Sequence, residues 1–252
     1  MEKKLLHIGT SGFSYDDWLG NFYPQFCPKL DMLQFYSSKF KIVEIDSTYY
    51  RIPSETTIKK WSKVTPDCFK FTAKFPKTVT HEGNIDQRLE TADLFINTMK
   101  LLQDKLAVLL LQFPYNFKPD QIDILFQIVK LLPSDIRFAL EIRNKCWLQE
   151  KKLFRLLQDQ NIAFCLIDHP WMPKVDIQTA DFSYFRFLGD RKKIEKDFSF
   201  ERNKRETELS YWKNVITNRL DTNKECFVFF NNHYSGHSPS TAASFKEQIK
   251  TL

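Results

Sequence analysis

The feature that most constrains the fold of this chain is an eightfold alternation of short β-rich runs with longer stretches of helical periodicity. Runs such as residues 108–111 and 227–230 are apolar throughout. Such runs are typical of strands in a parallel sheet that helices cover on the outside. The stretches between the runs carry apolar residues at helical spacing, which indicates amphipathic helices. The eight predicted strands are 5–11, 42–48, 69–75, 107–113, 137–143, 162–168, 182–188 and 226–232.

This alternation predicts an α/β fold, a single (β/α)8 TIM-type barrel that occupies residues 1–252 as one domain. The length agrees, since about 250 residues is typical of one such barrel. An open, doubly wound sheet is the alternative. Residues 169–180 contain Pro170 and Pro173 and leave little room for a helix, so we expect the sixth helix to be reduced or missing.

Composition excludes several classes of site. The five cysteines are odd in number and form no CxxC pair, which predicts reduced thiols in a cytoplasmic protein and neither a disulfide framework nor a zinc site. Only six glycines are present, against a glycine-rich nucleotide loop. The five histidines contain no HExxH, so no metal site is predicted, although magnesium or manganese on carboxylates stays open. No cofactor is indicated.

The sequence also bears on partners. No signal peptide and no membrane span are expected, because the chain enters a strand-like run directly and no apolar stretch approaches the ~18 residues of a span. The formal net charge of +6 favours anionic partners but is too small to establish nucleic-acid binding. Half of that excess falls in residues 189–205, after the seventh strand, where a solvated loop is the simpler interpretation.

Polar and charged side chains gather at the ends of the predicted strands, where barrels and open α/β sheets place their sites. If the apolar neighbours face the helices, four carboxylates and three cations converge at one end of the barrel. A self-contained network of ion pairs is the alternative, since buried charges must be paired. The residues are Glu44, Asp46, Glu141, Asp168, Lys74, Arg143 and Arg186, with Gln112 ending the fourth strand and Asn231 and Asn232 the eighth.

The eighth strand leads through residues 233–241 into the last helix. Exposed backbone N–H groups at that helix start are a candidate anion site, because barrels often bind phosphate after their last two strands. A plain helix cap is the alternative.

Several motifs, in order, resemble the family known as domain of unknown function 72, the YecE-like proteins. The resemblance covers nearly the whole chain and rests on residues 8–15 (IGTSGFSY) with Trp18, 22–24 (FYP), 43–50 (VEIDSTYY), 80–81 (TH), 112–114 (QFP), 140–143 (LEIR) with Trp147, and 229–232 (FFNN). It implies a TIM-type barrel, while the family name itself leaves the activity open.

The resemblance adds one site candidate and one departure. His81 matches the Thr-His motif of the family, in the loop after the third strand. Many members read Arg-x-His-Gly at the seventh strand, whereas this chain reads Arg186-Phe187-Leu188-Gly189. An essential acid or base at that histidine would therefore be missing here.

The leading functional hypothesis is an enzyme that does acid–base chemistry on a small polar or anionic molecule, phosphorylated compounds included. In this hypothesis the catalytic candidates are Asp46, Glu44, Glu141 and Lys74. Asp46 or Glu141 is the base, Glu44 is a further candidate carboxylate, and Lys74 is the acid or an electrostatic stabiliser. The substrate-binding candidates are Tyr15, Trp18, His81, Gln112, Arg143, Asp168, Arg186, Asn231 and Asn232. Two alternatives stay open: a non-catalytic protein that binds nucleic acid or an anionic metabolite, and a metal-dependent phosphoester hydrolase.

Overall fold

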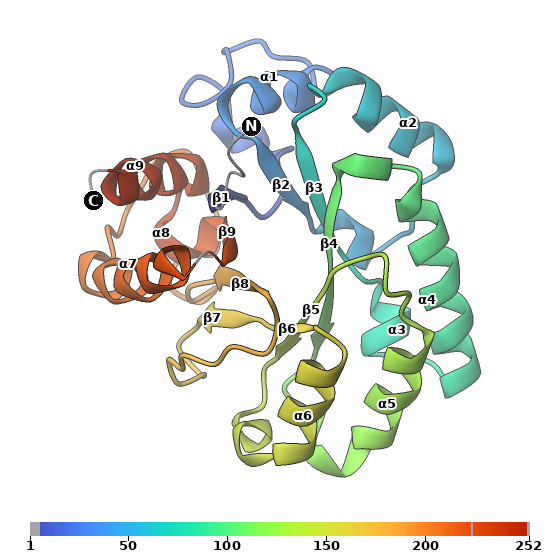
Figure 1. Ribbon diagram of the computed structural model, residues 1–252. Helices are drawn as coiled ribbons and strands as arrows, with labels where there is room; N and C mark the ends of the chain where they lie inside the picture. The colour runs from blue at the N-terminus through green and yellow to red at the C-terminus, as the bar shows by residue number, and fades with distance from the viewer. Residues whose placement is uncertain (1–5, 223, 251–252) are drawn as a thin grey trace. The chain divides into compact units, whose positions relative to one another are not determined.

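The computed structural model of the protein describes residues 6–222 and 224–250, in which strands and helices alternate (Figure 1). The strands are β1 (Leu6–Thr10), β2 (Ile42–Ile45), β3 (Lys70–Lys74), β4 (Leu106–Phe113), β5 (Phe138–Ile142), β6 (Ala163–Phe164), β7 (Leu166–Asp168), β8 (Phe182–Phe187) and β9 (Glu225–Phe230). The α-helices are α1 (Met32–Lys39), α2 (Glu55–Val64), α3 (Lys77–Thr80), α4 (Ile85–Lys100), α5 (Ile122–Leu131), α6 (Lys151–Asp159), α7 (Glu206–Asp221), α8 (Asn232–Ser235) and α9 (Ser238–Lys250). Short 3-10 helices are η1 (Asp16–Trp18), η2 (Ser47–Tyr49), η3 (Gln103–Lys105), η4 (Pro119–Gln121) and η5 (Lys145–Gln149).

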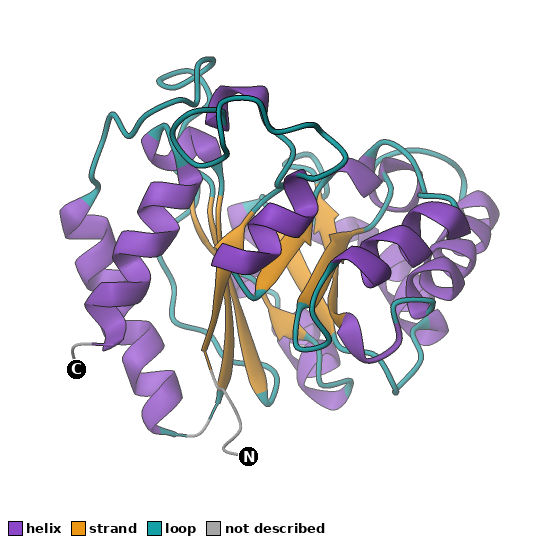
Figure 2. Cartoon of the chain, turned by 90° about the horizontal axis from the view of Figure 1, so that it is seen from above, coloured by secondary structure: helices purple, strands orange, loops and turns teal. Residues whose placement is uncertain are grey.

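The strands form two sheets, and the predicted α/β class is confirmed. One sheet has the order β1-β9-β8-β7 and the other β2-β3-β4-β5-β6. Parallel registers join β1 to β9, β9 to β8, β8 to β7, β3 to β4, β4 to β5 and β5 to β6. Helices flank the strands (Figure 2), which explains why runs such as residues 108–113 are buried on both faces.

The chain divides into two compact units. Unit 1 runs up to Glu44, and includes Leu166–Asp176 and the chain from Asp181 onward. Unit 2 comprises Ile45–Cys165 and Ile177–Ala180. The division falls within β2. The interpretation of residues 1–252 as one undivided barrel domain stays a prediction.

Each unit has a core built from the predicted helical stripes. In unit 1, α7 and α9 pack against β9, and Trp212 on α7 and Phe245 on α9 are buried. In unit 2, α4 buries Phe95 and Met99. A capping box starts that helix: Asn84 Oδ1 accepts from the N–H of Gln87, whose side chain accepts from the N–H of Asn84.

Three predicted strands are wrong in extent. The strand predicted over 226–232 ends at Phe230, because Asn231 caps α8 and Asn232 begins it. The strand predicted over 42–48 ends at Ile45, because Asp46 has helical backbone angles and starts η2. The strand predicted over 162–168 is broken at Cys165 into β6 and β7, which belong to different sheets. The Thr179 hydroxyl accepts from Phe164 N at 2.7 Å and donates to Ile162 O at 2.6 Å, so a side chain replaces strand neighbours there.

The connection after β7 agrees with its prediction. Residues 169–180 contain no helix, in keeping with the expected loss of the sixth helix. Trp171 in this loop is largely exposed.

Candidate functional site

The predicted strand-end residues are shared between the two units. Unit 2 contains Asp46, Lys74, His81, Gln112, Glu141 and Arg143, and unit 1 contains Tyr15, Trp18, Glu44, Asp168, Arg186, Asn231 and Asn232. The hypothesis that these residues line one cavity stays a prediction, so the geometry of each unit is described by itself.

In unit 1, Glu44 is the centre of a buried hydrogen-bond network. Its side chain is 0% exposed and comes from β2. Oε1 accepts from Ser11 Oγ at 2.7 Å and from Arg186 Nη2 and Nε at 2.7 and 3.1 Å, while Oε2 accepts from Tyr184 OH at 2.7 Å. Four charge-assisted hydrogen bonds hold this carboxylate in one position. Arg186 is thus paired with Glu44 within unit 1.

Asp168, at the end of β7, is held in a second network of unit 1. Its Oδ2 accepts from Trp212 Nε1 at 2.9 Å and from Tyr234 OH at 3.2 Å, and Lys174 Nζ lies 4.0 Å away. Burial, and next the negative charge of Asp168, raise the pKa of Tyr234, so its hydroxyl remains a donor at neutral pH. The backbone O of Asp168 also accepts from Leu188 N at 3.0 Å.

The departure from the family pattern, Leu188, lies beside a tight backbone contact. Gly189 has φ +67°, and a Cβ there would lie 2.2 Å from His233 O. Glycine is therefore required at the position that follows Leu188. Leu188 itself is buried.

The remaining predicted residues of unit 1 serve local structure. Asn231 Oδ1 accepts from His233 N at 3.0 Å and caps α8. Asn232 Oδ1 accepts from Trp18 Nε1 at 3.2 Å. The rings of Tyr15 and Trp18 pack together with their centroids 4.7 Å apart, and the Tyr15 hydroxyl donates to Ser11 O.

In unit 2, Lys74 ends β3 with its ammonium over an aromatic face. Lys74 Nζ lies 3.8 Å from the ring centroid of Tyr49, a distance typical of a cation–π contact. Thr48 Oγ1 donates to Lys74 O at 2.7 Å and joins η2 to the end of the strand. Asp46, the residue before η2, is half-buried.

Glu141 and Arg143 come from the end of β5. Arg143 Nε donates to Glu141 Oε1 at 2.6 Å, and the carboxylate is fully buried. The Arg143 side chain is 32% exposed, and its terminal amino groups make no hydrogen bond to residues that the structure describes. Gln112 on β4 is in register with Glu141 and donates to Phe113 O at 2.7 Å. The Arg143 guanidinium therefore reaches the surface with its terminal N–H donors unused by the described residues.

His81 follows α3 and lies within the field of both cations. Its Nδ1 is 2.8 Å from Thr80 Oγ1, and its ring makes an edge contact with Tyr49 at 5.2 Å between centroids. Desolvation, followed by the positive charges of Lys74 and Arg143, lowers the pKa of His81 to about 4. The imidazole is therefore neutral at pH 7 and can accept or donate a proton.

Sequence reasoning missed the aromatic residues that support these charges. The Tyr49 ring makes a cation–π contact with Lys74. Tyr184 donates a hydrogen bond to Glu44, and Trp212 and Tyr234 donate to Asp168. Tyr49 lies within the 43–50 motif, which was a signal for it. Trp212 and Tyr234 lie on helices far from Asp168 in the sequence, so no pattern joined them.

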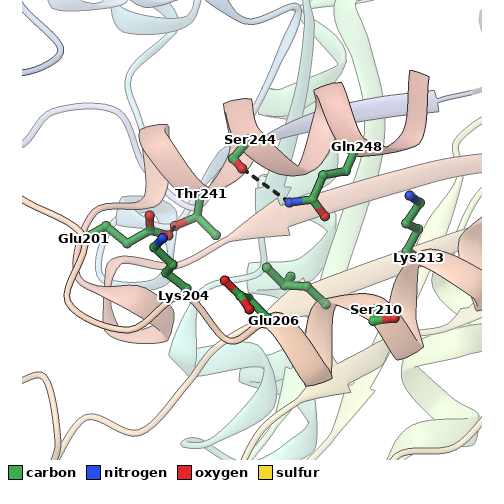
Figure 3. Close-up of a pocket in the computed structure, with 9 residues that line it drawn as sticks. Glu201, Lys204, Glu206, Ser210, Lys213, Thr241, Ser244 and Gln248 are labelled. Carbon is green, nitrogen blue, oxygen red and sulfur yellow. Dashed lines mark hydrogen bonds between the residues drawn. The ribbon is translucent and has the colours of Figure 1, made fainter. Parts of the chain in front are cut away.

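A pocket of about 490 Å³ lies elsewhere in unit 1, between α7 and α9 (Figure 3). Lys204, Glu206 and Lys213 line it from the α7 side, and Ser244 and Gln248 from α9. Its lining carries both signs of charge and none of the candidate catalytic or substrate-binding residues.

The described residues contain neither a cluster of metal ligands nor a helix that could span a membrane. Residues 6–222 and 224–250 bring together no group of three His, Cys, Asp or Glu side chains that could hold a metal ion. None of the helices described is both long enough and apolar enough to cross a bilayer.

Comparison with known proteins decides the family. The family model described as "Protein of unknown function DUF72" matches residues 7–252. The chain belongs to the DUF72 family. The YunF protein of Bacillus subtilis, named as a UPF0759 protein, is 28% identical over 97% of this chain and 95% of its own length. The UPF0759 protein YecE of Escherichia coli K12 is 25% identical over 65% of this chain and 59% of its own length.

Solved DUF72 structures are similar over the whole chain. A DUF72 protein of Thermotoga maritima has a TM-score of 0.82 and 28% identity, covering 98% of this chain and 100% of that chain. A DUF72 protein of Enterococcus faecalis has a TM-score of 0.81 at 23% identity, covering 97% and 95%. The predicted TIM-type α/β fold class is thus confirmed as the fold of the family.

Proposed function

We propose that this DUF72 protein is an enzyme that does acid–base chemistry on a small polar or anionic substrate. The observation that carries the proposal is the cluster formed by Lys74, His81 and Arg143 at the strand ends of unit 2. There desolvation, and next the positive charges of Lys74 and Arg143, lower the pKa of the half-buried His81 imidazole to about 4. A neutral imidazole within the field of two cations suits a site where a substrate anion is bound and a proton is moved.

The geometry supports a separate role for each residue. Arg143 binds the anionic group of the substrate through its terminal amino groups, since Nε is already paired with Glu141. Lys74 stabilises negative charge that develops during the reaction. His81 Nε2 exchanges a proton with the substrate, because Nδ1 is engaged with Thr80. Glu141 and Asp46 remain the candidate bases, and Gln112 a binding residue.

Unit 1 contributes differently in this proposal. Glu44 accepts four hydrogen bonds, so it acts as a positioning residue for Arg186 rather than in proton transfer. That Arg186, Asp168, Asn231, Tyr15 and Trp18 bind substrate stays a prediction, since each already makes contacts within unit 1.

Anion binding is tested by thermal unfolding in rising inorganic phosphate. Saturating phosphate should stabilise the parent protein, by about 2.7 kcal/mol at a hundredfold excess over Kd. Arg143→Met should lose this response. The matched control is Arg155→Met, an exposed arginine on α6 whose removal should leave the response unchanged. An equal response in Arg143→Met would refute anion binding by Arg143.

Proton transfer is tested with a panel of small candidate substrates. Small carboxylates and phosphorylated compounds are incubated with the protein in D2O, and NMR detects deuterium incorporation at carbon. We expect exchange with at least one compound and its loss in His81→Gln. Phosphate-dependent stabilisation without exchange in a broad panel would favour the non-catalytic binding function instead.

A further inference from the structure

Two buried nitrogen donors lie close together in the sequence, just before α9. The Asn232 and His237 side chains are 1% and 2% exposed. Within the described part of the chain, Asn232 Nδ2 and His237 Nε2 have no hydrogen-bond partner. Buried donors without an acceptor are costly and few in native proteins, so each calls for a physical explanation.

The hydrogen bonds of Asn232 establish which of its atoms is the donor. Its Oδ1 accepts from Trp18 Nε1 at 3.2 Å, from Ser238 N at 3.1 Å and from Ser238 Oγ at 2.8 Å. Three donors on one atom assign it as the amide oxygen. The other atom is therefore the NH2 group, with two protons to donate.

The bonds of His237 similarly assign its tautomer. Ser240 N donates to His237 Nδ1 at 3.4 Å, and Ser240 Oγ lies 2.7 Å from the same atom. Because Nδ1 accepts, the proton of the neutral ring is on Nε2. Desolvation lowers the pKa of His237, so the neutral form prevails at pH 7. Both unpartnered nitrogens are thus donors.

Both side chains contact Trp18. Trp18, which donates to Asn232, also makes an edge contact with the His237 ring at 6.1 Å between centroids. Gly236, between α8 and His237, has φ +110°, and a Cβ there would lie 2.5 Å from Phe200 O. Close packing against residue 200 therefore holds the loop in place.

The site is at the positive end of a 13-residue helix. The backbone donors that the sequence suggested for an anion are engaged. Ser238 N binds Asn232, Ser240 N binds His237, and Pro239 has no N–H. The backbone at the start of α9 therefore contributes the positive end of the helix dipole. The hydrogen-bond donors come from the side chains of Asn232 and His237.

We infer that Asn232 Nδ2 and His237 Nε2 together bind a small inorganic anion. A water molecule fits less well, because it would bring two hydrogens of its own. The acceptor closest in sequence and contacts, Asn232 Oδ1, already accepts three hydrogen bonds. An anion only accepts, and the helix dipole favours it.

The neighbouring segment carries charges of both signs. Glu201 Oε1 accepts from Thr241 Oγ1 at 3.0 Å, one turn into α9. The Arg205 guanidinium donates through Nε to Tyr234 O at 3.1 Å, whereas Arg202 reaches Ser235 O only through its backbone N–H and its guanidinium binds Asp197. The site lies in unit 1 and goes beyond the proposed function, which rests on Lys74, His81 and Arg143.

The experiment uses chloride and inorganic phosphate as probes. Protein dialysed free of both is titrated with each at constant ionic strength, and the imidazole nitrogens of His237 are followed by NMR. We expect a saturable shift of Nε2 with one of the two anions at 1:1 stoichiometry. Absence of a saturable shift with both anions would overturn the inference.

Two variants locate the anion. Asn232→Asp keeps an oxygen for Trp18 and Ser238 but replaces the NH2 donor with a negative charge, so affinity should fall at least about tenfold. Asn203→Asp adds the same charge to a neighbouring loop, where Asn203 Oδ1 accepts from Arg205 N, and should change affinity little.

If Asn232→Asp does not fold, His237→Phe provides the second test, because it removes the Nε2 donor and keeps a ring. Since the reporting imidazole is then absent, affinity is measured in parent and variant from the anion dependence of thermal unfolding. Equal affinity in parent and variant would show an adventitious ion only and would overturn the site. A crystal structure from phosphate with water on both nitrogens would overturn it as well.

Discussion

Glu44 in unit 1 and Arg143 in unit 2 are both charged residues at strand ends, yet their surroundings differ. Glu44 is fully buried and accepts four hydrogen bonds. Arg143 is a third exposed and uses only Nε within the described residues. A saturated buried charge is typical of a structural network, whereas a charge with unused donors at the surface can bind a ligand.

The contrast extends to the neighbours. The carboxylates Glu44 and Asp168 are surrounded by hydroxyl and indole donors, which hold them in place. Lys74 and Arg143 instead act on the His81 imidazole, whose pKa is lowered by desolvation and next by these two positive charges. Sequence position alone assigned all of these residues to one site, whereas burial and partners separate them by role.

The largest effect is expected from Glu44→Gln. Removing the carboxylate charge takes the Glu44 ion pair from the buried Arg186 guanidinium, at a cost of about 3–5 kcal/mol in the free energy of unfolding. Urea denaturation measures it. The matched control is Glu55→Gln, which breaks an exposed pair with Lys59 and should cost less than about 0.5 kcal/mol. Similar small losses in both variants would break the comparison.

A somewhat smaller effect is expected from Arg186→Met. Glu44 keeps its bonds from Ser11 and Tyr184, so the loss should be about 3 kcal/mol. The double variant Glu44→Gln with Arg186→Met should lose less than the sum of the two, because the pair is coupled. Additive losses would show that the two side chains act independently. Loss of phosphate stabilisation with little loss of stability would assign Arg186 to anion binding instead.

Trp212→Phe examines the Asp168 network and should have a modest effect. The change removes the indole donor to Asp168 and keeps an aromatic ring, so unfolding should become easier by about 1 kcal/mol. Trp61→Phe is the control, since Trp61 stacks on Phe71 and its indole nitrogen makes no hydrogen bond to described residues. An equal loss in both variants would mean that ring size, not the hydrogen bond, matters.

The smallest effect concerns unit 2 and is a change in titration. Arg143→Met should raise the pKa of His81 above about 4, because one of the two nearby positive charges is removed. The pKa should stay below its ordinary value of 6.5, since desolvation is the larger cause. NMR titration of His81 measures the shift, and Arg155→Met should leave it unchanged.

The same shift predicts a pH dependence of stability with a definite sign. Between pH 6.5 and about 4 the unfolded chain binds a proton at His81 that the folded protein does not. Stability is therefore lost as the pH falls through this window. His81→Gln should show a shallower loss over the same range, and an unchanged slope would contradict the low pKa.

From the sequence alone, the class of fold and the missing helix after β7 could be predicted. Runs such as residues 108–111 are apolar on both faces and can be buried only in a sheet that helices cover. Pro170 and Pro173 excluded a regular helix in the connection over residues 169–180. Local pattern was sufficient for these features because each depends on residues adjacent in the chain.

Which charges are held in buried ion pairs, and which have donors that can bind a ligand, depends on the tertiary structure. Asp46 left the strand because its backbone turns into η2, and period two cannot anticipate such a turn. The partners of Glu44 come from the end of β1 and from β8, and those of Asp168 from α7 and α8, up to 142 residues away. Hydrogen bonding and burial depend on distances between side chains that folding brings together, and those distances leave no local pattern in the sequence.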